Sequence, residues 1–463
     1  MAEVPTYEQL VVLVAEQAAT IARLEERVAE LERQLGRNSR NSSIPPSKDP
    51  LEAPSRSLRR KAGRKPGKQP GAPGSALRLV DLPEEVVEHR PSACRGCGAA
   101  LRRAAEVGVT RRQVHDIPQV SGPVTEHRLH RRRCACGCIT TADAPAGVNA
   151  PVTYGSNLRA LAVYLVVFQH VPVERAALLI ADVTGAAVST GWVSSTVAAT
   201  AQDLVDVEAM IRTLITLAHV LHADETSTSI GGDTWWLHVA STPNLTAYHL
   251  DPSRGRKAVT AFGILPDYSG IAVHDALSVY DDYPKATHAL CGAHIARELT
   301  AAAESHPDQT WPSAALDALF GLNDAAHAAR EMGLHQVGPE IADPLHKAWQ
   351  RAVLVGLAAH PRGPGRKQSK TRNLLDRLRD RDEQVLRFAR DLSVPFTNNQ
   401  AERDLRPAKT QLKISGCHRS ETGARAWLRI RGYISTAHKN NINVLHTIRG
   451  AIIGDPWKPV PAT

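Results

Sequence analysis

The sequence predicts an α/β protein in which helices cover a mixed β-sheet, with a heptad helix and a cysteine-rich module ahead of this core. Three strand-like runs, a helix-like stretch and a fourth strand-like run follow one another in the middle of the chain. Stretches with helical periodicity flank this block, which favours a sheet covered by helices. The strands are predicted at 218–223, 234–241, 245–250 and 270–274, the helix at 256–265, and the flanking helical stretches at 157–215 and 290–395.

Length and composition narrow the classes of protein further. A chain of 463 residues is expected to hold about two to four domains, and its 43% hydrophobic residues suffice for a buried core. The longest apolar stretch, 158–168, carries Arg159 and predicts a buried helix, not a membrane span. The first residues lack the pattern of a signal peptide. Seven cysteines, five of them between Cys94 and Cys138, exclude a secreted disulfide scaffold and favour a reducing cytoplasm.

Residues 1–36 carry a heptad pattern that predicts a coiled coil. Apolar residues recur at both seam positions over about four heptads, with Gln17 as the polar exception. Such a seam needs a partner helix, and β-branched residues at the first position with leucine at the second favour a two-stranded homodimer. An amphipathic helix packed on its own protein is the alternative. The seam residues are Tyr7, Val14, Ile21, Val28 and Leu35 at the first position, and Leu10, Leu24 and Leu31 at the second.

Residues 37–78 are predicted to form a basic disordered linker. They hold eleven Lys and Arg against Asp49 and Glu52, a net charge of +9 that equals the excess of the whole chain. Proline, glycine and serine are frequent in this segment, and such a composition cannot build a core. Concentrated positive charge indicates a polyanion partner, most commonly nucleic acid, although a solvated linker that binds nothing has the same composition. Arg64 and Lys65 fit either a narrow minor groove or simple phosphate contact.

Residues 79–150 are predicted to form a zinc-binding module. Cys94-Arg-Gly-Cys97 is followed, after 36 residues, by Cys134-Ala-Cys136-Gly-Cys138. A two-residue spacer on a glycine turn lets two thiolates face one ion, and tetrahedral Zn²⁺ takes four such ligands. The predicted structural zinc ligands are Cys94, Cys97, Cys134 and Cys136, with Cys138 competing for the fourth place.

Two adjoining segments are predicted to contact DNA. Arg131 and Arg132 lie beside the second cysteine group, where they fit contacts to phosphate. In the helical region 151–215, segments 173–185 and 189–195 resemble two helices around a glycine turn. A DNA-reading helix-turn-helix has this pattern, and so does an ordinary helical hairpin.

Two acidic residues follow strand-like runs of the predicted sheet. Asp224 ends the first run and Asp275 the fourth, and polar groups at the strand ends of an open sheet can meet. Carboxylates there suit Mg²⁺ or Mn²⁺, and a pair of such ions serves phosphodiester chemistry. Glu225 is excluded as a ligand because adjacent strand residues face opposite sides, and Glu402 is the candidate for a third carboxylate. Each acid also has an ordinary role: a strand end, a turn cap and, for Glu402, a capping box with Asn399.

Several specific motifs are distributed over nearly the whole chain. They are 38–49 and 64–74 in the linker, 222–226 with 235–242 around Asp224, 273–276 with Tyr280 around Asp275, and 398–409 with 413–416 around Glu402. These motifs, and the order of heptads, basic linker, cysteine module, core and short tail, resemble the insertion-sequence DDE transposases of the IS-sixty-six family. The one-residue spacer between Cys134 and Cys136 departs from the commoner two-residue spacer.

The resemblance implies an RNase H-like catalytic core with a helical insertion, and two small accessory proteins from the same element as partners. The core is expected at 216–415, its insertion at about 295–395 and a helical tail at 416–463. The resemblance also implies Asp224, Asp275 and Glu402 as magnesium ligands. Cys291-Gly-Ala-His294 matches a Cys-x-x-His feature of several DDE groups, for which a structural role or one that supports the ligands is expected.

The predicted function is metal-dependent DNA transposition. Water would cleave a phosphodiester at the element end, and the freed 3′-hydroxyl would attack target DNA. Basic residues after Glu402 are predicted to hold DNA phosphates, although a solvated helix face has the same pattern; they are Arg403, Arg406, Lys409 and Lys413. The alternatives are a non-catalytic, zinc-dependent DNA-binding regulator derived from a transposase, and a nuclease that cuts without joining.

Overall fold

The structure, a computed structural model, describes residues 6–42, 49, 77–116, 120, 122–145, 147–365 and 367–460. The chain divides into two compact units, one of Met1–Leu58 with Thr125–Thr463 and the other of Arg59–Val124. In the smaller unit, an isolated bridge joins Ala93 to Ala100. The helices and sheets described below belong to the larger unit.

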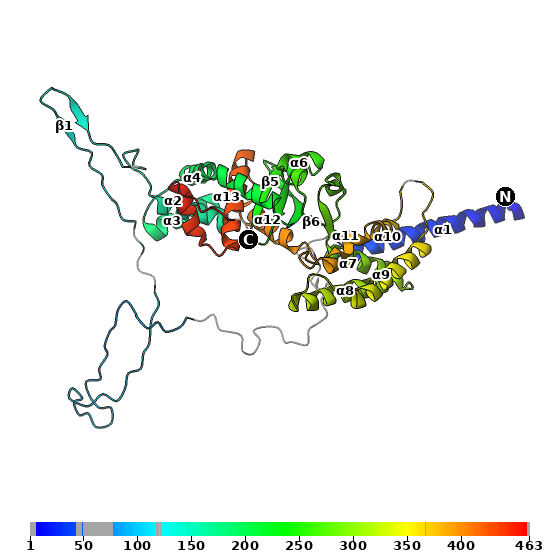
Figure 1. Cartoon of the computed structure of the whole chain (residues 1–463), viewed down its shortest axis with the longest axis horizontal. Helices are drawn as coiled ribbons and strands as arrows, with labels where there is room; N and C mark the ends of the chain where they lie inside the picture. Colours follow the sequence, from blue (N-terminus) through cyan, green and yellow to red (C-terminus); the bar gives the residue numbers. More distant parts are fainter. Residues whose placement is uncertain are drawn as a thin grey trace, which may run out of the picture. The chain divides into compact units, whose positions relative to one another are not determined.

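A five-stranded mixed sheet forms the centre of the larger unit (Figure 1). Its strand order is β5-β4-β3-β6-β7; β3, β4 and β5 are antiparallel neighbours, whereas β6 runs parallel to both β3 and β7. The strands are β3 (Val220–Ile230), β4 (Asp233–Ser241), β5 (Thr246–Asp251), β6 (Ile271–His274) and β7 (Thr287–Leu290). The predicted mixed α/β sheet is confirmed, and its topology is compatible with an RNase H-like fold.

The first strand is longer than the sequence predicts, because a hairpin extends it. Thr226–Ile230 continue β3 as partners of Asp233–Leu237 in β4. Antiparallel pairing satisfies the backbone of this polar run, and such a sheet tolerates one solvated face. Gly231 and Gly232, with φ of 59° and 98°, form the two-residue turn. Asp224 therefore lies inside β3 and not at its end, which corrects the sequence prediction.

Helices before and after the sheet share one hydrophobic core with it. α13 packs on β5, α4 and α5, and α14 packs on α2. Ile215, Leu237, Ile430 and Ile434 are buried together in this core. The region before the sheet and the predicted tail therefore fold against the sheet jointly. The elements are α2 (Ser156–Val163) with a π-helical turn (Tyr164–Phe168), α3 (Val173–Thr184), α4 (Thr190–Asp203), α5 (Val205–Thr216), α6 (Arg256–Phe262), α13 (Glu421–Lys439) and α14 (Val444–Ile452).

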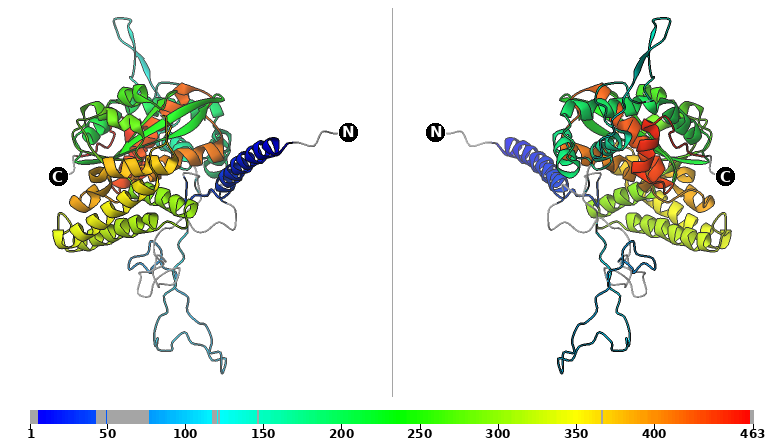
Figure 2. Two further views of the ribbon diagram at one scale, coloured as in Figure 1. Left: turned by 90° about the vertical axis from the view of Figure 1, so that its right-hand side faces the viewer. Right: turned by 90° about the vertical axis from the view of Figure 1, so that its left-hand side faces the viewer.

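Helices inserted between β7 and α12 (Asn399–Ser415) build a second core against β6 and β7. α8 and α9 lie side by side, and α11 contacts β7 (Figure 2). The fully buried Trp311 and Trp349 belong to this core. α12 then packs on β3 and β4. The inserted helices are α7 (Gly292–Ser305), α8 (Trp311–Glu331), α9 (Pro339–Ala359), α10 (Lys370–Asp380) and α11 (Asp382–Arg390).

The N-terminal heptads form a single helix, α1 (Tyr7–Leu35), whose seam residues are exposed. After α1, the backbone N–H and the hydroxyl of Ser39 both bond the carboxylate of Asp49. Most of the predicted linker, including Arg64 and Lys65, lies outside the described residues. Within the described part of the chain, no helix is both long and apolar enough to cross a bilayer.

Candidate active site

The register between β3 and β6 sets Asp224 beside Asp275. His222 pairs with Val273 across these parallel strands, so the residues two positions further along each chain lie at the same level. Side chains at one level of neighbouring parallel strands leave the sheet on the same face. Asp275 directly follows β6, and its Oδ1 accepts the N–H of Leu277 at 3.1 Å, which fixes the turn after the strand.

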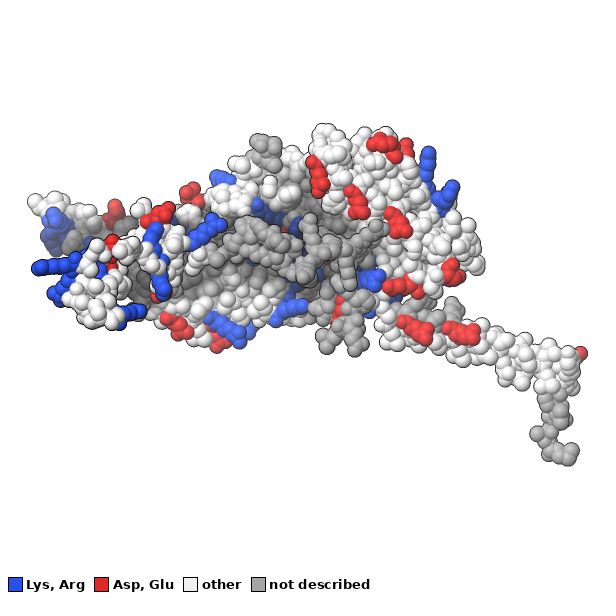
Figure 3. Space-filling model, turned by 90° about the horizontal axis from the view of Figure 1, so that it is seen from below, with Lys and Arg blue, Asp and Glu red and all other residues white. Residues whose placement is uncertain are grey.

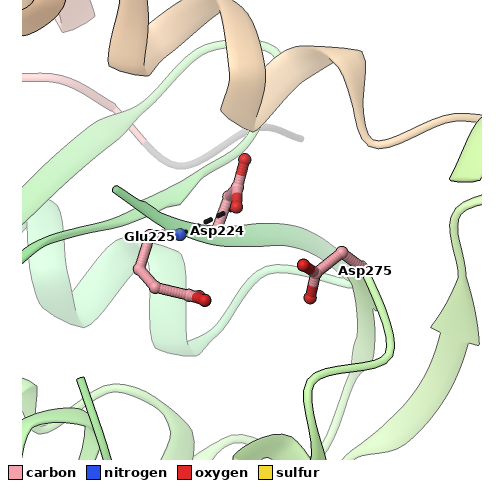
Figure 4. Close-up of side chains that lie close together, drawn as sticks. All are labelled: Asp224, Glu225 and Asp275. Atoms are coloured by element: carbon pink, nitrogen blue, oxygen red, sulfur yellow. Dashed lines mark hydrogen bonds between the residues drawn. The ribbon is translucent and has the colours of Figure 1, made fainter. Parts of the chain in front are cut away.

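Glu225 joins these two aspartates. Among the described residues, Asp224, Glu225 and Asp275 form a group in which one oxygen of each lies within 4.8 Å of the others. Asp224 and Glu225 leave β3 on opposite sides, as strand alternation predicts (Figure 4). The longer Glu225 side chain still brings its carboxylate close to the aspartates. Strand alternation alone predicts that Glu225 lies away from the aspartates, and this prediction is wrong.

Glu225 is buried, and both of its oxygens are already hydrogen-bonded. Its side chain is 1% exposed. Oε1 accepts from Nε and Nη2 of Arg254 at 2.9 and 2.6 Å, and Oε2 accepts from the Tyr280 hydroxyl at 2.7 Å. The guanidinium of Arg254 also lies over the ring of Trp236, 4.9 Å from its centroid. The Glu225 carboxylate therefore lies beside the aspartates while Arg254 and Tyr280 bind its two oxygens.

Burial and neighbouring negative charge both disfavour the ionised form of Asp224. Burial, followed by the charges of Glu225, Asp275 and Glu402, raises the pKa of Asp224 to about 8, although the N–H of Glu225 bonds its Oδ1 at 2.8 Å. Clustered carboxylates of this kind are what a bound cation stabilises. Hard oxygen donors within 4.8 Å of one another therefore fit Mg²⁺ or Mn²⁺.

Glu402 lies on the first turn of α12, outside this group of three. Its Oε1 is 3.8 Å from Nη2 of the buried Arg297 on α7. Its charge still contributes to the raised pKa of Asp224, so the two carboxylates interact. The N-cap of α12 is Asn398, which makes no side-chain capping bond, so the capping box expected with Asn399 is wrong. The role of Glu402 as third ligand stays a prediction.

The basic residues after Glu402 lie on the exposed face of α12. Arg403, Arg406, Lys409 and Lys413 are all exposed. Spacings of four, seven and eleven residues place Arg406, Lys409 and Lys413 on the same helical stripe as Glu402. The opposite side of α12 is buried, where Asp404 bonds Lys439. The four cations are therefore accessible to a phosphate backbone next to the acidic residues.

Arg131 and Arg132, two further predicted DNA contacts, are also exposed. Arg131 and Arg132 lie in β1 (Arg131–Arg133), which pairs with β2 (Ile139–Thr141), and every residue of β1 is exposed. On the face drawn in Figure 3, several basic side chains lie together at the left of the view, and acidic side chains are more frequent at the right. α3 and α4 flank Gly185, as predicted, and their role in DNA reading stays a prediction.

The five cysteines of the predicted zinc module occupy two closed turns, one in each unit. In the smaller unit, Cys94 bonds Ala99 and Gly98 through its backbone, and the N–H groups of Cys97 and Gly96 lower the pKa of the Cys94 thiol. In the β1–β2 turn, the N–H of Cys138 and then the thiol of Cys134 lower the pKa of Cys136. Thiolate-favouring turns suit a metal ligand. The set Cys94, Cys97, Cys134 and Cys136, with Cys138 as the competitor, stays a prediction.

A family model described as Transposase IS66 family matches residues 151–426. The chain belongs to this family. The matched range contains Asp224, Asp275 and Glu402. A second model, described as a family of unknown function, matches residues 2–78, the heptads and the basic linker. No curated protein matches the chain.

Proposed function

We propose that this IS66-family chain is a metal-dependent DNA transposase that cleaves the ends of its element and joins them to target DNA. The observation that carries the proposal is the register of β3 and β6, which brings Asp224 beside Asp275 inside the family-matched region. The raised pKa of Asp224 supports a cation there. The reaction is expected in the cytoplasm, on DNA.

The proposed chemistry divides among residues of three elements. Asp224 on β3 and Asp275 after β6 would hold the cations, and Glu402 on α12 would complete the site. A pair of divalent cations supplies activation of the attacking oxygen and stabilisation of the leaving one. Arg254 and Tyr280 hold the Glu225 carboxylate beside the aspartates. The exposed cations of α12 hold the DNA phosphates beside the acids.

The remaining modules serve assembly in this proposal. α1 pairs with α1 of a second copy, and a structural Zn²⁺ bound by the cysteine turns stabilises the module that carries Arg131 and Arg132. Arg64 and Lys65 in the basic linker add phosphate contacts. Two small proteins from the same element are the expected accessory partners.

The test is cleavage and strand transfer by the purified full chain on DNA carrying the ends of its element, with Mg²⁺ or Mn²⁺. We expect Asp224→Asn, Asp275→Asn and Glu402→Gln each to lower the cleavage rate at least about a hundredfold, since metal ligation supplies several kcal/mol to the transition state. Asp317→Asn, an exposed change on α8, is the matched control. Full activity of all three variants would show that the acids are not catalytic.

The same assay separates the alternatives. A regulator would bind the element ends and leave them uncut at any metal concentration. A nuclease would cut the ends, yet yield no product joined to target DNA. Joined products that disappear with Asp224→Asn support the transposase.

A further inference from the structure

Hydrogen bonds of Asn398 join the strands and the helix that carry the three acids. Asn398 is 1% exposed and immediately precedes α12. On its side-chain side, Oδ1 is 2.9 Å from Nδ1 of His222, and Nδ2 donates to the carbonyl of Ala223 at 2.8 Å. These two residues directly precede Asp224 on β3.

The backbone of Asn398 extends the same connection to the other two acids. Its N–H donates to Sγ of Cys291 at 3.2 Å, and the N–H of Cys291 bonds the carbonyl of His274 at 2.9 Å, next to Asp275. Its carbonyl accepts the N–H of Glu402 at 3.3 Å. Asn398 is therefore hydrogen-bonded to Glu402 and to the two residues that precede Asp224. Through Cys291 it is also connected to His274, the residue that precedes Asp275.

The contacts require a carboxamide. Nδ2 must donate to a carbonyl while Oδ1 accepts from the imidazole, and the carboxamide of asparagine carries both groups on one carbon. An ionised aspartate would set an acceptor against the Ala223 carbonyl. A leucine would leave that buried carbonyl and the His222 nitrogen without a partner.

We propose that Asn398 is a positioning residue that fixes the start of α12, and hence Glu402, relative to Asp224 and Asp275. This inference rests on the proposed metal-dependent function. It also gives Cys291 of the Cys-x-x-His feature a defined part, because its buried thiol accepts the Asn398 N–H. Residues outside the ligand set that orient ligands commonly change metal affinity by about ten- to a hundredfold when they are substituted.

The experiment compares Asn398→Asp with Asn399→Asp in the full-length protein. Asn399 is the exposed neighbour, so both variants carry the same change of charge at the same end of α12. Mn²⁺ binding by calorimetry and the Mn²⁺ midpoint for DNA cleavage are measured beside the thermal midpoint. We expect Mn²⁺ affinity to fall about ten- to a hundredfold in Asn398→Asp and to stay unchanged in Asn399→Asp. Added negative charge by itself would strengthen Mn²⁺ binding, so weakening identifies loss of geometry.

A second pair of variants covers the case in which Asn398→Asp does not fold. Cys291→Ser keeps an acceptor for the Asn398 N–H, whereas Cys291→Ala removes it, and we expect weaker Mn²⁺ binding only in the alanine variant. The positioning role would be overturned if a folded Asn398→Asp bound Mn²⁺ as tightly as the wild type while Asp224→Asn abolished binding. If Asn398→Asp does not fold, wild-type Mn²⁺ affinity in Cys291→Ala would overturn it in the same way. Wild-type protein that binds no Mn²⁺ would overturn the proposed function, and the positioning role with it.

Discussion

Burial and the charges of Glu225, Asp275 and Glu402 all disfavour the ionised form of Asp224. Together they raise its pKa to about 8 in the folded chain, against 3.8 for an aspartate exposed to water. Because the folded-state pKa is the higher one, stability present below about pH 4 is lost as the pH rises toward about 8. We therefore expect Asp224→Asn, in EDTA, to raise the free energy of unfolding by several kcal/mol at pH 8 and by much less at pH 5, since each pKa unit corresponds to about 1.4 kcal/mol.

Urea denaturation at the two pH values measures this difference. Asp317→Asn, on the exposed face of α8, serves as the control and should show no such dependence on pH. A stabilisation of equal size at pH 5 and pH 8 would mean that burial and the neighbouring acids do not raise the pKa of Asp224.

The sequence predicts the two aspartates of the site better than the groups that support them. Asp224 and Asp275 follow recognisable strand patterns, and two parallel strands in register bring them together. The partners of Glu225 are 29 and 55 residues away in the chain, so no local pattern reports them. Tyr280 is at least part of a family-like motif, whereas Arg254 carries no such signal.

At the scale of elements, a buried ion pair joins α12 to α13 and to the β4–β5 hairpin. Nζ of Lys439 donates to Asp404 at 2.8 Å and to the carbonyls of Thr242 and Leu245 at 2.9 and 2.8 Å. Burial lowers the pKa of Lys439, and Asp404 opposes this. We expect Lys439→Met to destabilise the protein by about 3–5 kcal/mol, because Asp404 would be left as a buried, uncompensated charge.

Chemical denaturation measures the effect, with Lys347→Met on the exposed side of α9 as the control. Adding Asp404→Asn to Lys439→Met should recover part of the loss, since the unpaired charge is removed. A loss as small as that of the control would indicate that the pair is not tightly coupled to folding.

Element boundaries follow from the sequence where a local signal exists. β4, β5 and β6 lie within a residue or two of their predicted bounds, because apolar alternation and flanking turns report them. β3 extends to Ile230 because its partner strand supplies hydrogen bonds to a polar run. No local pattern predicts that α13 packs in the main core, because its contacts with β5 and α4 are long-range.

At the scale of the whole molecule, α1 presents an apolar seam whose residues are exposed. Leu24 and Leu31 on this seam are 57% and 42% exposed, and Val14 and Ile21 are exposed as well. A seam of this length is stable in water only when a second helix covers it. We expect the full chain to sediment as a dimer, and Leu24→Glu with Leu31→Glu to convert it to a monomer, because four like charges would face one another in the paired helices.

Ala15→Glu with Ala22→Glu, which adds the same charge on the side of the same helix that faces away from the seam, is the control and should leave the dimer intact. Sedimentation velocity at several protein concentrations distinguishes the two variants. A dimer that survives the seam substitutions would mean that another surface of the protein holds the copies together, and that the heptads serve a different partner.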